Sequence, residues 1–147
     1  MSYQDLNYAA PGLLKLGACF IYDTLIVTAL SFACAGLFLL LAGDATHSLK
    51  RYLLQLTLWL VIGVYFVWCW SRSGQTLAMK TWKLKLVNID INLLSIQAAW
   101  LRYIAATASL MLLGLGFLWA IVDRDKLYLH DRLLKNRIIA VQRNKAW

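Results

Sequence analysis

Three long apolar runs, separated by polar segments, set the hydrophobic pattern of the chain. They cover residues 16–43, 52–70 and 103–122, and only the first of them contains a charged residue. Because an α-helix rises about 1.5 Å per residue, roughly 20 apolar residues are enough to cross the hydrocarbon core of a bilayer. The pattern therefore predicts an all-α membrane protein with three transmembrane helices.

The third run also fits a second arrangement. The segments on either side of it, residues 71–102 and 123–147, are both rich in Lys and Arg, which predicts that both lie in the cytoplasm. One complete crossing would instead place them on opposite sides. Gly114 and Gly116 lie near the middle of the run and would ease a bend into a re-entrant hairpin, although glycines also serve close helix packing. We expect the plain crossing, since the run matches the length of one span, and keep the bend as the alternative.

Short polar stretches outside the runs alternate with the period of a β-strand. Residues 82–86 alternate apolar and basic side chains, residues 89–93 repeat the alternation, and residues 138–141 are rich in β-branched side chains. The pattern predicts a short cytoplasmic β-like or interfacial segment, which pairs with the tail if both lie on one side. That pairing favours the bent third run. An amphipathic helix over residues 77–86, resting on anionic lipid, fits the same residues.

Composition agrees with a membrane protein of one domain. Hydrophobic residues make up 61% of the chain, the mean hydropathy is +0.62, and no repeat or linker divides residues 1–147. The first run is too long for the core of a signal peptide, so we expect it to be retained. The net charge of +8 would suggest nucleic acid in a soluble protein. Here the basic residues flank the apolar runs, which predicts contact with anionic lipid headgroups and no nucleic acid, and places the sparsely basic residues 44–51 outside.

Asp23 is the charged residue of the first run. An aspartate near the centre of a spanning helix costs roughly 2.5–3.5 kcal/mol on insertion scales, so it usually faces a partner helix or a water-filled cavity. Two roles fit this position. Asp23 either binds a proton and a small cation in alternation, or it forms a permanent buried ion pair with Arg102, Lys80 or Arg72 that fixes the helix register.

Small and hydroxylated residues predict where the helices approach one another. In the first run they recur at helical spacing and form a stripe beside Asp23, and small residues of the third run would supply the opposing surface. Aromatic residues near Arg72 and Arg124 are expected to anchor helix ends at the headgroups. The stripe consists of Gly17, Thr24, Thr28, Ser31 and Ala35, the opposing set of Ala105, Ala106, Ser109 and Gly116, and the anchors of Tyr65, Phe66, Trp68, Trp70 and Trp119.

Residues that often carry catalysis or bind metals lack supporting motifs in this chain. The three cysteines lie in or beside apolar runs without CxxC spacing, so we expect buried thiols. His130 precedes Asp131, but neither a nucleophile motif nor metal-ligand spacing accompanies them. We therefore expect no enzyme, no metal and no cofactor. Asp131 is expected to cap a turn or to pair with basic residues of segment 74–85. The cysteines are Cys19, Cys34 and Cys69.

The order of several short motifs resembles the RDD family, small bacterial membrane proteins named for one arginine and two aspartates. The resemblance covers nearly the whole chain, and it implies that Asp23 and Asp131 are the two signature aspartates. The motifs are Pro11-Gly12 leading into Tyr22-Asp23, then Gly74-Gln75-Thr76-Leu77 with Lys80, then Arg102, then Leu129-His130-Asp131-Arg132.

Two positions depart from the family pattern. The arginine at the mouth of the first helix falls at Lys15 or Leu16 here, so Lys15 takes its place if the charge is needed. Lysine reaches the headgroups but lacks the planar fork that binds a carboxylate with two hydrogen bonds. Ala78 stands where the family often has glycine.

The resemblance implies a multi-pass protein of the bacterial cytoplasmic (inner) membrane with a suspected transport role. Three functions remain as hypotheses: transport of a small cation or a proton-coupled solute, a non-catalytic accessory or assembly subunit of a larger membrane complex, or a structural membrane protein without a ligand of its own. Three helices make a thin scaffold, so a transporter is expected to be a homo-oligomer, whereas an accessory subunit binds other membrane subunits. The candidate transport or ion-pair residues are Asp23, Lys15, Arg102, Asp131 and Lys80, and the candidate loop residues are Gly74, Thr76 and His130.

Overall fold

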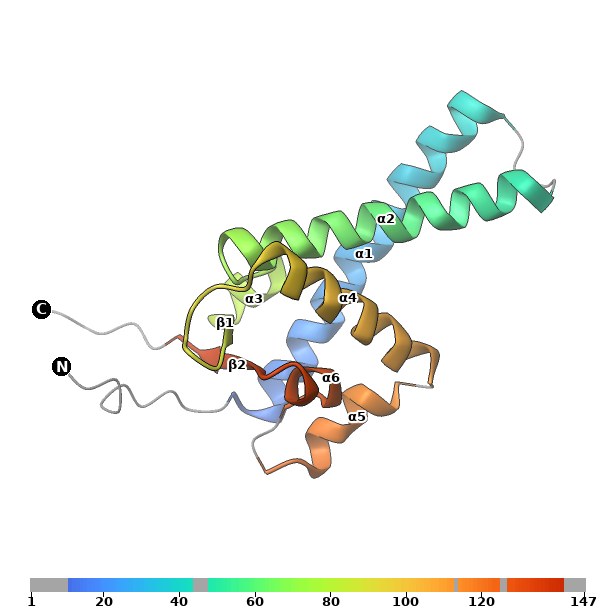
Figure 1. Ribbon diagram of the computed structural model, residues 1–147. Helices are drawn as coiled ribbons and strands as arrows, with labels where there is room; N and C mark the ends of the chain where they lie inside the picture. The colour runs from blue at the N-terminus through green and yellow to red at the C-terminus, as the bar shows by residue number, and fades with distance from the viewer. Residues whose placement is uncertain (1–10, 44–47, 113, 125–126, 142–147) are drawn as a thin grey trace, which may run out of the picture.

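Two long helices and six shorter elements make up the described part of the chain. The computed structural model describes residues 11–43, 48–112, 114–124 and 127–141. Figure 1 shows α1 and α2 as two long crossed helices, with the shorter elements gathered around one end of the pair. In chain order the elements are α1 (Leu13–Ala42), α2 (Ser48–Arg72), α3 (Leu77–Thr81), β1 (Leu84–Asn88), α4 (Ile96–Met111), α5 (Leu115–Val122), α6 (Leu129–Leu133) and β2 (Asn136–Ala140).

Helices α1 and α2 are the two described helices that are long and apolar enough to cross a membrane. α1 begins after Gly12 and ends at Gly43, whose φ of 71° lies in a backbone region that favours glycine. The N–H of Gly43 donates a hydrogen bond to the carbonyl of Leu39 and so closes the last turn. The two helices cover the first two apolar runs, as expected. Residues 44–47, within the connection predicted to lie outside, are not among the described residues.

The third apolar run is bent. Gly114, with φ 72° and ψ 12°, adopts a left-handed conformation that ends the helical path between α4 and α5. α5 then packs back on α4, and a Cβ added to Gly116 would collide with the Oγ of Ser109. The single helix predicted over residues 103–122 is therefore not formed, and the bent alternative describes the run. The length of an apolar run does not distinguish one spanning helix from two short helices joined at a glycine.

Strands β1 and β2 form an antiparallel pair that runs from Leu84 opposite Ala140 to Asn88 opposite Asn136. The alternation along residues 82–86 thus predicts a strand that the structure forms from Leu84 onward, and the helix considered over residues 77–86 is formed only as α3, over Leu77–Thr81. The second alternation, at residues 89–93, is a turn in which Ile91 has a φ of 64°. A bilayer cannot separate two hydrogen-bonded strands, so β1 and β2 lie on one side of it.

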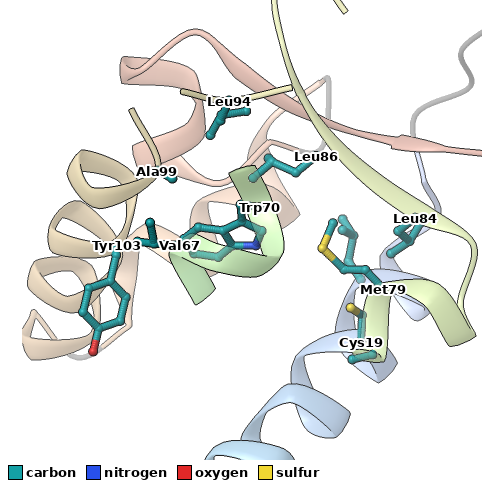
Figure 2. Packing of buried hydrophobic residues seen from close by; sticks show 11 residues of the cluster. Cys19, Val67, Trp70, Met79, Leu84, Leu86, Leu94, Ala99 and Tyr103 are labelled. Carbon is teal, nitrogen blue, oxygen red and sulfur yellow. The ribbon is translucent and has the colours of Figure 1, made fainter. Parts of the chain in front are cut away.

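The apolar core lies where the short elements meet α1 and α2. Figure 2 shows side chains of α1, α2, α3, β1 and α4 converging in this cluster. Leu84 and Leu86 of β1 are fully buried in it. Away from this end, α1 has few buried residues, and its large apolar side chains are exposed. The core therefore fixes one end of the helix pair. Members labelled in Figure 2 include Cys19, Trp70, Met79, Leu86 and Ala99.

Cysteine labelling in a variant without native cysteines tests the topology. We expect Asp90→Cys and Leu133→Cys to react with an impermeant thiol reagent from the same side of the membrane, because the β1–β2 pair ties their segments together. Both native side chains are exposed. Arg51→Cys, at the other end of α2, is expected to react from the opposite side. Labelling of positions 90 and 133 from opposite sides would contradict the bent third run.

Candidate functional site

Arg102 of α4 and Asp131 of α6 form a buried ion pair. The guanidinium donates two hydrogen bonds, from Nε to Oδ1 at 2.6 Å and from Nη2 to Oδ2 at 2.9 Å. Asp131 is 0% exposed and Arg102 is 5% exposed. The guanidinium also lies 4.3 Å from the ring centre of Trp70 on α2, where the face of the indole attracts it. With two charge-assisted hydrogen bonds and a cation–π contact, the pair locks α6 to α4 and α2.

His130 lies beside this pair in an apolar setting. Its ring stacks on Tyr128 with 5.5 Å between the ring centres, and its Nε2 lies 3.8 Å from Oδ1 of Asp131. Burial lowers the pKa of His130 to about 4, although the Asp131 carboxylate acts in the opposite direction. Burial likewise raises the pKa of Tyr128. At neutral pH both side chains are therefore uncharged, and the charges of Arg102 and Asp131 balance each other.

Asp23 accepts hydrogen bonds at only one of its two carboxylate oxygens. The hydroxyl of Thr76 donates to Oδ2 at 3.1 Å, and the thiol of Cys19 approaches the same oxygen at 3.8 Å. The Thr76 hydroxyl also accepts a hydrogen bond from the backbone N–H of Met79, so it caps α3 while it holds Asp23. Oδ1 of Asp23 is buried and has no hydrogen-bond partner among the described residues. The carboxylate of Asp23 is therefore only half satisfied by the described residues.

Asp23 lines a cavity of about 480 Å³ that lies between α1, α2 and α4. Most of the cavity surface is carbon, with the ionisable groups Asp23, Arg102 and His130 among the lining residues. Thr24, Thr28 and Thr107 add hydroxyls to an otherwise apolar wall. The largest apolar lining residues are Phe20, Trp59, Phe66, Trp70, Tyr103 and Tyr128.

The structure brings together some of the residues singled out in the sequence and leaves others apart. Asp131 pairs with Arg102 rather than with the loop at 74–85, and Asp23 forms no ion pair with any described residue. The permanent ion pair considered for Asp23, with Arg102, Lys80 or Arg72, is therefore not formed among the described residues. Lys15 and Lys80 are exposed, and neither belongs to an ion pair in the described part of the chain. No described cluster of His, Cys, Asp or Glu could hold a metal ion.

Two loop residues of the sequence motif have structural roles. Gly74 has a φ of 68°, and its carbonyl accepts a 2.7 Å hydrogen bond from the N–H of Leu86. This bond ties the end of α2 to β1. Thr76 positions Asp23 as described above. Gly74 and Thr76 therefore hold the elements and the carboxylate of the site in place without lining the cavity themselves.

Two packing expectations differ from the structure. Ser109 and Gly116 contact each other and close the α4–α5 hairpin, rather than facing the stripe on α1. On that stripe, a Cβ added to Gly17 would meet nothing within 4 Å. Trp70, predicted as a headgroup anchor, is 5% exposed and covers Arg102, whereas Trp68 is 61% exposed. The sequence does not distinguish the buried Trp70 from the exposed Trp68, because both lie near the end of one apolar run.

Comparison with known proteins gives one family match. The model of the RDD family matches residues 14–135, which include Asp23, Arg102 and Asp131. No curated protein and no solved structure matches the chain significantly.

Proposed function

We propose that this chain, which belongs to the RDD family of membrane proteins, is a transporter in which Asp23 is loaded alternately with a cation and a proton. The observation that carries the proposal is the state of Asp23, which lines the cavity and has one buried carboxylate oxygen, Oδ1, that accepts no hydrogen bond from a described residue. A carboxylate within a membrane helix requires a partner, and a proton or a cation satisfies that need.

The two aspartates, Asp23 and Asp131, have different roles in this proposal. Arg102 donates two hydrogen bonds to Asp131, so Asp131 has a structural role. Among the described residues Asp23 has only the hydroxyl of Thr76 and a distant thiol as donors, so it keeps its capacity to exchange a proton for a cation. Arg102 lines the same cavity, but Asp131 neutralises its charge, so one positive charge is enough to balance the ionised carboxylate of Asp23. The arrangement favours one monovalent charge at a time.

A homo-oligomer in the bacterial cytoplasmic membrane fits this proposal best. α1 leaves most of its large apolar side chains exposed, and α4 and α5 expose Leu110, Leu115 and Ile121. Lipid covers part of this surface, but two candidate spans make a narrow scaffold for a pathway. Basic residues near the β1–β2 pair, such as Lys83 and Arg137, are exposed and suited to anionic headgroups.

The second candidate function is an accessory subunit of a larger membrane complex. It is favoured by α1 beyond Ala29, where the outer part of the helix contributes no buried residue among those described. Such a helix would pack on a foreign subunit. Purification in mild detergent separates the candidates, because a foreign subunit in fixed ratio supports the accessory role and a homo-oligomer without partners supports transport.

Asp23→Asn tests the transport role. The asparagine oxygen still accepts the hydrogen bond from Thr76, and no described cation loses its partner, so we expect the melting temperature in detergent to change little. We expect proton movement across proteoliposomes after a sodium or potassium pulse to disappear. Asp90→Asn, at an exposed turn, is the matched control and should keep the wild-type signal. Unchanged proton movement in the Asp23 variant would exclude the proposed role.

A further inference from the structure

The size of the cavity indicates the class of solute. A volume of about 480 Å³ lies within the range of roughly 300–1,000 Å³ that is typical of sites for small organic molecules. The cavity offers a single carboxylate and three threonine hydroxyls in a surface that is mostly carbon.

One wall of the cavity is a continuous row of aromatic rings. The ring centres of Trp59 and Tyr103 are 5.2 Å apart, those of Tyr103 and Phe66 are 6.2 Å apart, and those of Phe66 and Trp70 are 5.1 Å apart. The last ring of this row already stabilises a cation, because the guanidinium of Arg102 lies over Trp70. The faces of the other rings attract a positive charge in the same way.

The ionisable residues of the site carry one negative charge that no positive charge balances. Arg102 and Asp131 neutralise each other, and the buried His130 is uncharged at neutral pH. The ionised carboxylate of Asp23 therefore gives the group of four residues a net charge of −1. A solute with one positive charge brings this sum to zero.

From these observations we infer that the cavity binds a hydrophobic organic monocation, whose charge lies beside the carboxylate of Asp23 and whose apolar body lies against Trp59, Phe66 and Tyr103. The inference rests on the proposed function and specifies its substrate class. The positive charge of such a solute would interact with the carboxylate of Asp23, and its apolar groups would pack on the row of aromatic rings.

Binding of two ions of the same shape and opposite charge tests the inference. The full chain in uncharged maltoside micelles is titrated with tetraphenylphosphonium and with tetraphenylborate, and empty micelles give the background. We expect tetraphenylphosphonium to bind at least tenfold more tightly than tetraphenylborate. Equal binding of the two ions would show an unselective apolar slot, such as one for an acyl chain, and would overturn the inference.

Substitutions locate the bound ion. We expect Asp23→Asn to weaken tetraphenylphosphonium binding at least tenfold and Trp59→Leu to weaken it several-fold. Trp68→Leu is the matched control on the same helix, because Trp68 is exposed and does not line the cavity. An equal loss in the Trp59 and Trp68 variants would overturn the location. If the Asp23 variant does not fold, the comparison of the two ions on the wild-type chain still decides the question of charge.

The failure of this inference can be distinguished from that of the proposed function. If a sodium or potassium pulse moves protons through Asp23 while tetraphenylphosphonium does not bind, the transport proposal stands and the organic substrate class is wrong. If tetraphenylphosphonium binds selectively but no cation moves protons, the site is real and the transport proposal is wrong. If neither result is obtained, both are wrong.

Discussion

Asp131→Asn is expected to lower the free energy of unfolding by about 3–5 kcal/mol, because it leaves the buried guanidinium of Arg102 without a negative partner. The side chain keeps its size, so the loss reports charge rather than a cavity. Both partners are nearly inaccessible to water, and Trp70 covers the guanidinium without neutralising it. Denaturant unfolding of the purified protein in mild detergent measures the effect.

Two further variants show whether the loss comes from an unpaired buried charge. The double variant Arg102→Met with Asp131→Leu removes both charges, and we expect it to recover most of the stability lost in Asp131→Asn. Arg132→Gln removes the charge that pairs with Asp123, but Arg132 is 54% exposed, so we expect a loss of about 0–1 kcal/mol. A double variant as unstable as Asp131→Asn would contradict this explanation.

Gly74→Ala is expected to destabilise the fold by about 2–5 kcal/mol. The φ of 68° strains any residue with a Cβ, which costs about 1–3 kcal/mol. The new Cβ would also lie 2.7 Å from the carbonyl oxygen of Leu86, and this backbone atom cannot move without disturbing β1. Since Thr76 follows two residues later, we also expect weaker cation binding at Asp23. Thermal unfolding in detergent, with and without cation, measures both effects.

Gly114→Ala provides the matched control. Gly114 has a φ of 72°, close to that of Gly74, but a Cβ there would meet nothing within 4 Å. We expect this variant to lose about 1–2 kcal/mol from backbone strain alone. If the Gly74 and Gly114 variants lose the same stability, the contact with Leu86 contributes nothing, and only the backbone conformation explains the need for glycine.

The hydrophobic pattern predicts α1, α2 and β1 because each of these elements has one dominant periodicity or run length. It fails for the third run, where the left-handed conformation of Gly114 decides between one helix and two. The hydrophobic pattern does not show that Gly114 has a left-handed conformation, because it records only which residues are apolar. The basic residues on both sides of the run did indicate the bend, and the β1–β2 pair agrees with them.

The candidate site could be predicted only in part. A charge within an apolar run marks Asp23 directly, and the family motifs mark Asp131 and Arg102. Their pairing was not predictable, because Arg102 and Asp131 come from α4 and α6, and only the bend at Gly114 brings these helices together. The role of Trp70 was missed for a similar reason: the cluster that includes Leu86 and Leu94 covers a residue that local sequence places at a helix end.

The pairing of β1 with β2 has a consequence for the order of events during synthesis. β1 leaves the ribosome long before β2, and the whole of α4, α5 and α6 lies between them in the sequence. Until α6 and β2 are complete, β1 lacks the hydrogen bonds that it shares with β2, and Arg102 lacks the carboxylate of Asp131. Closing so long a loop is slow compared with forming local helices. The nascent protein therefore carries an unpaired edge of β1 and an unneutralised Arg102, and both find their partners when α6 and β2 have been made.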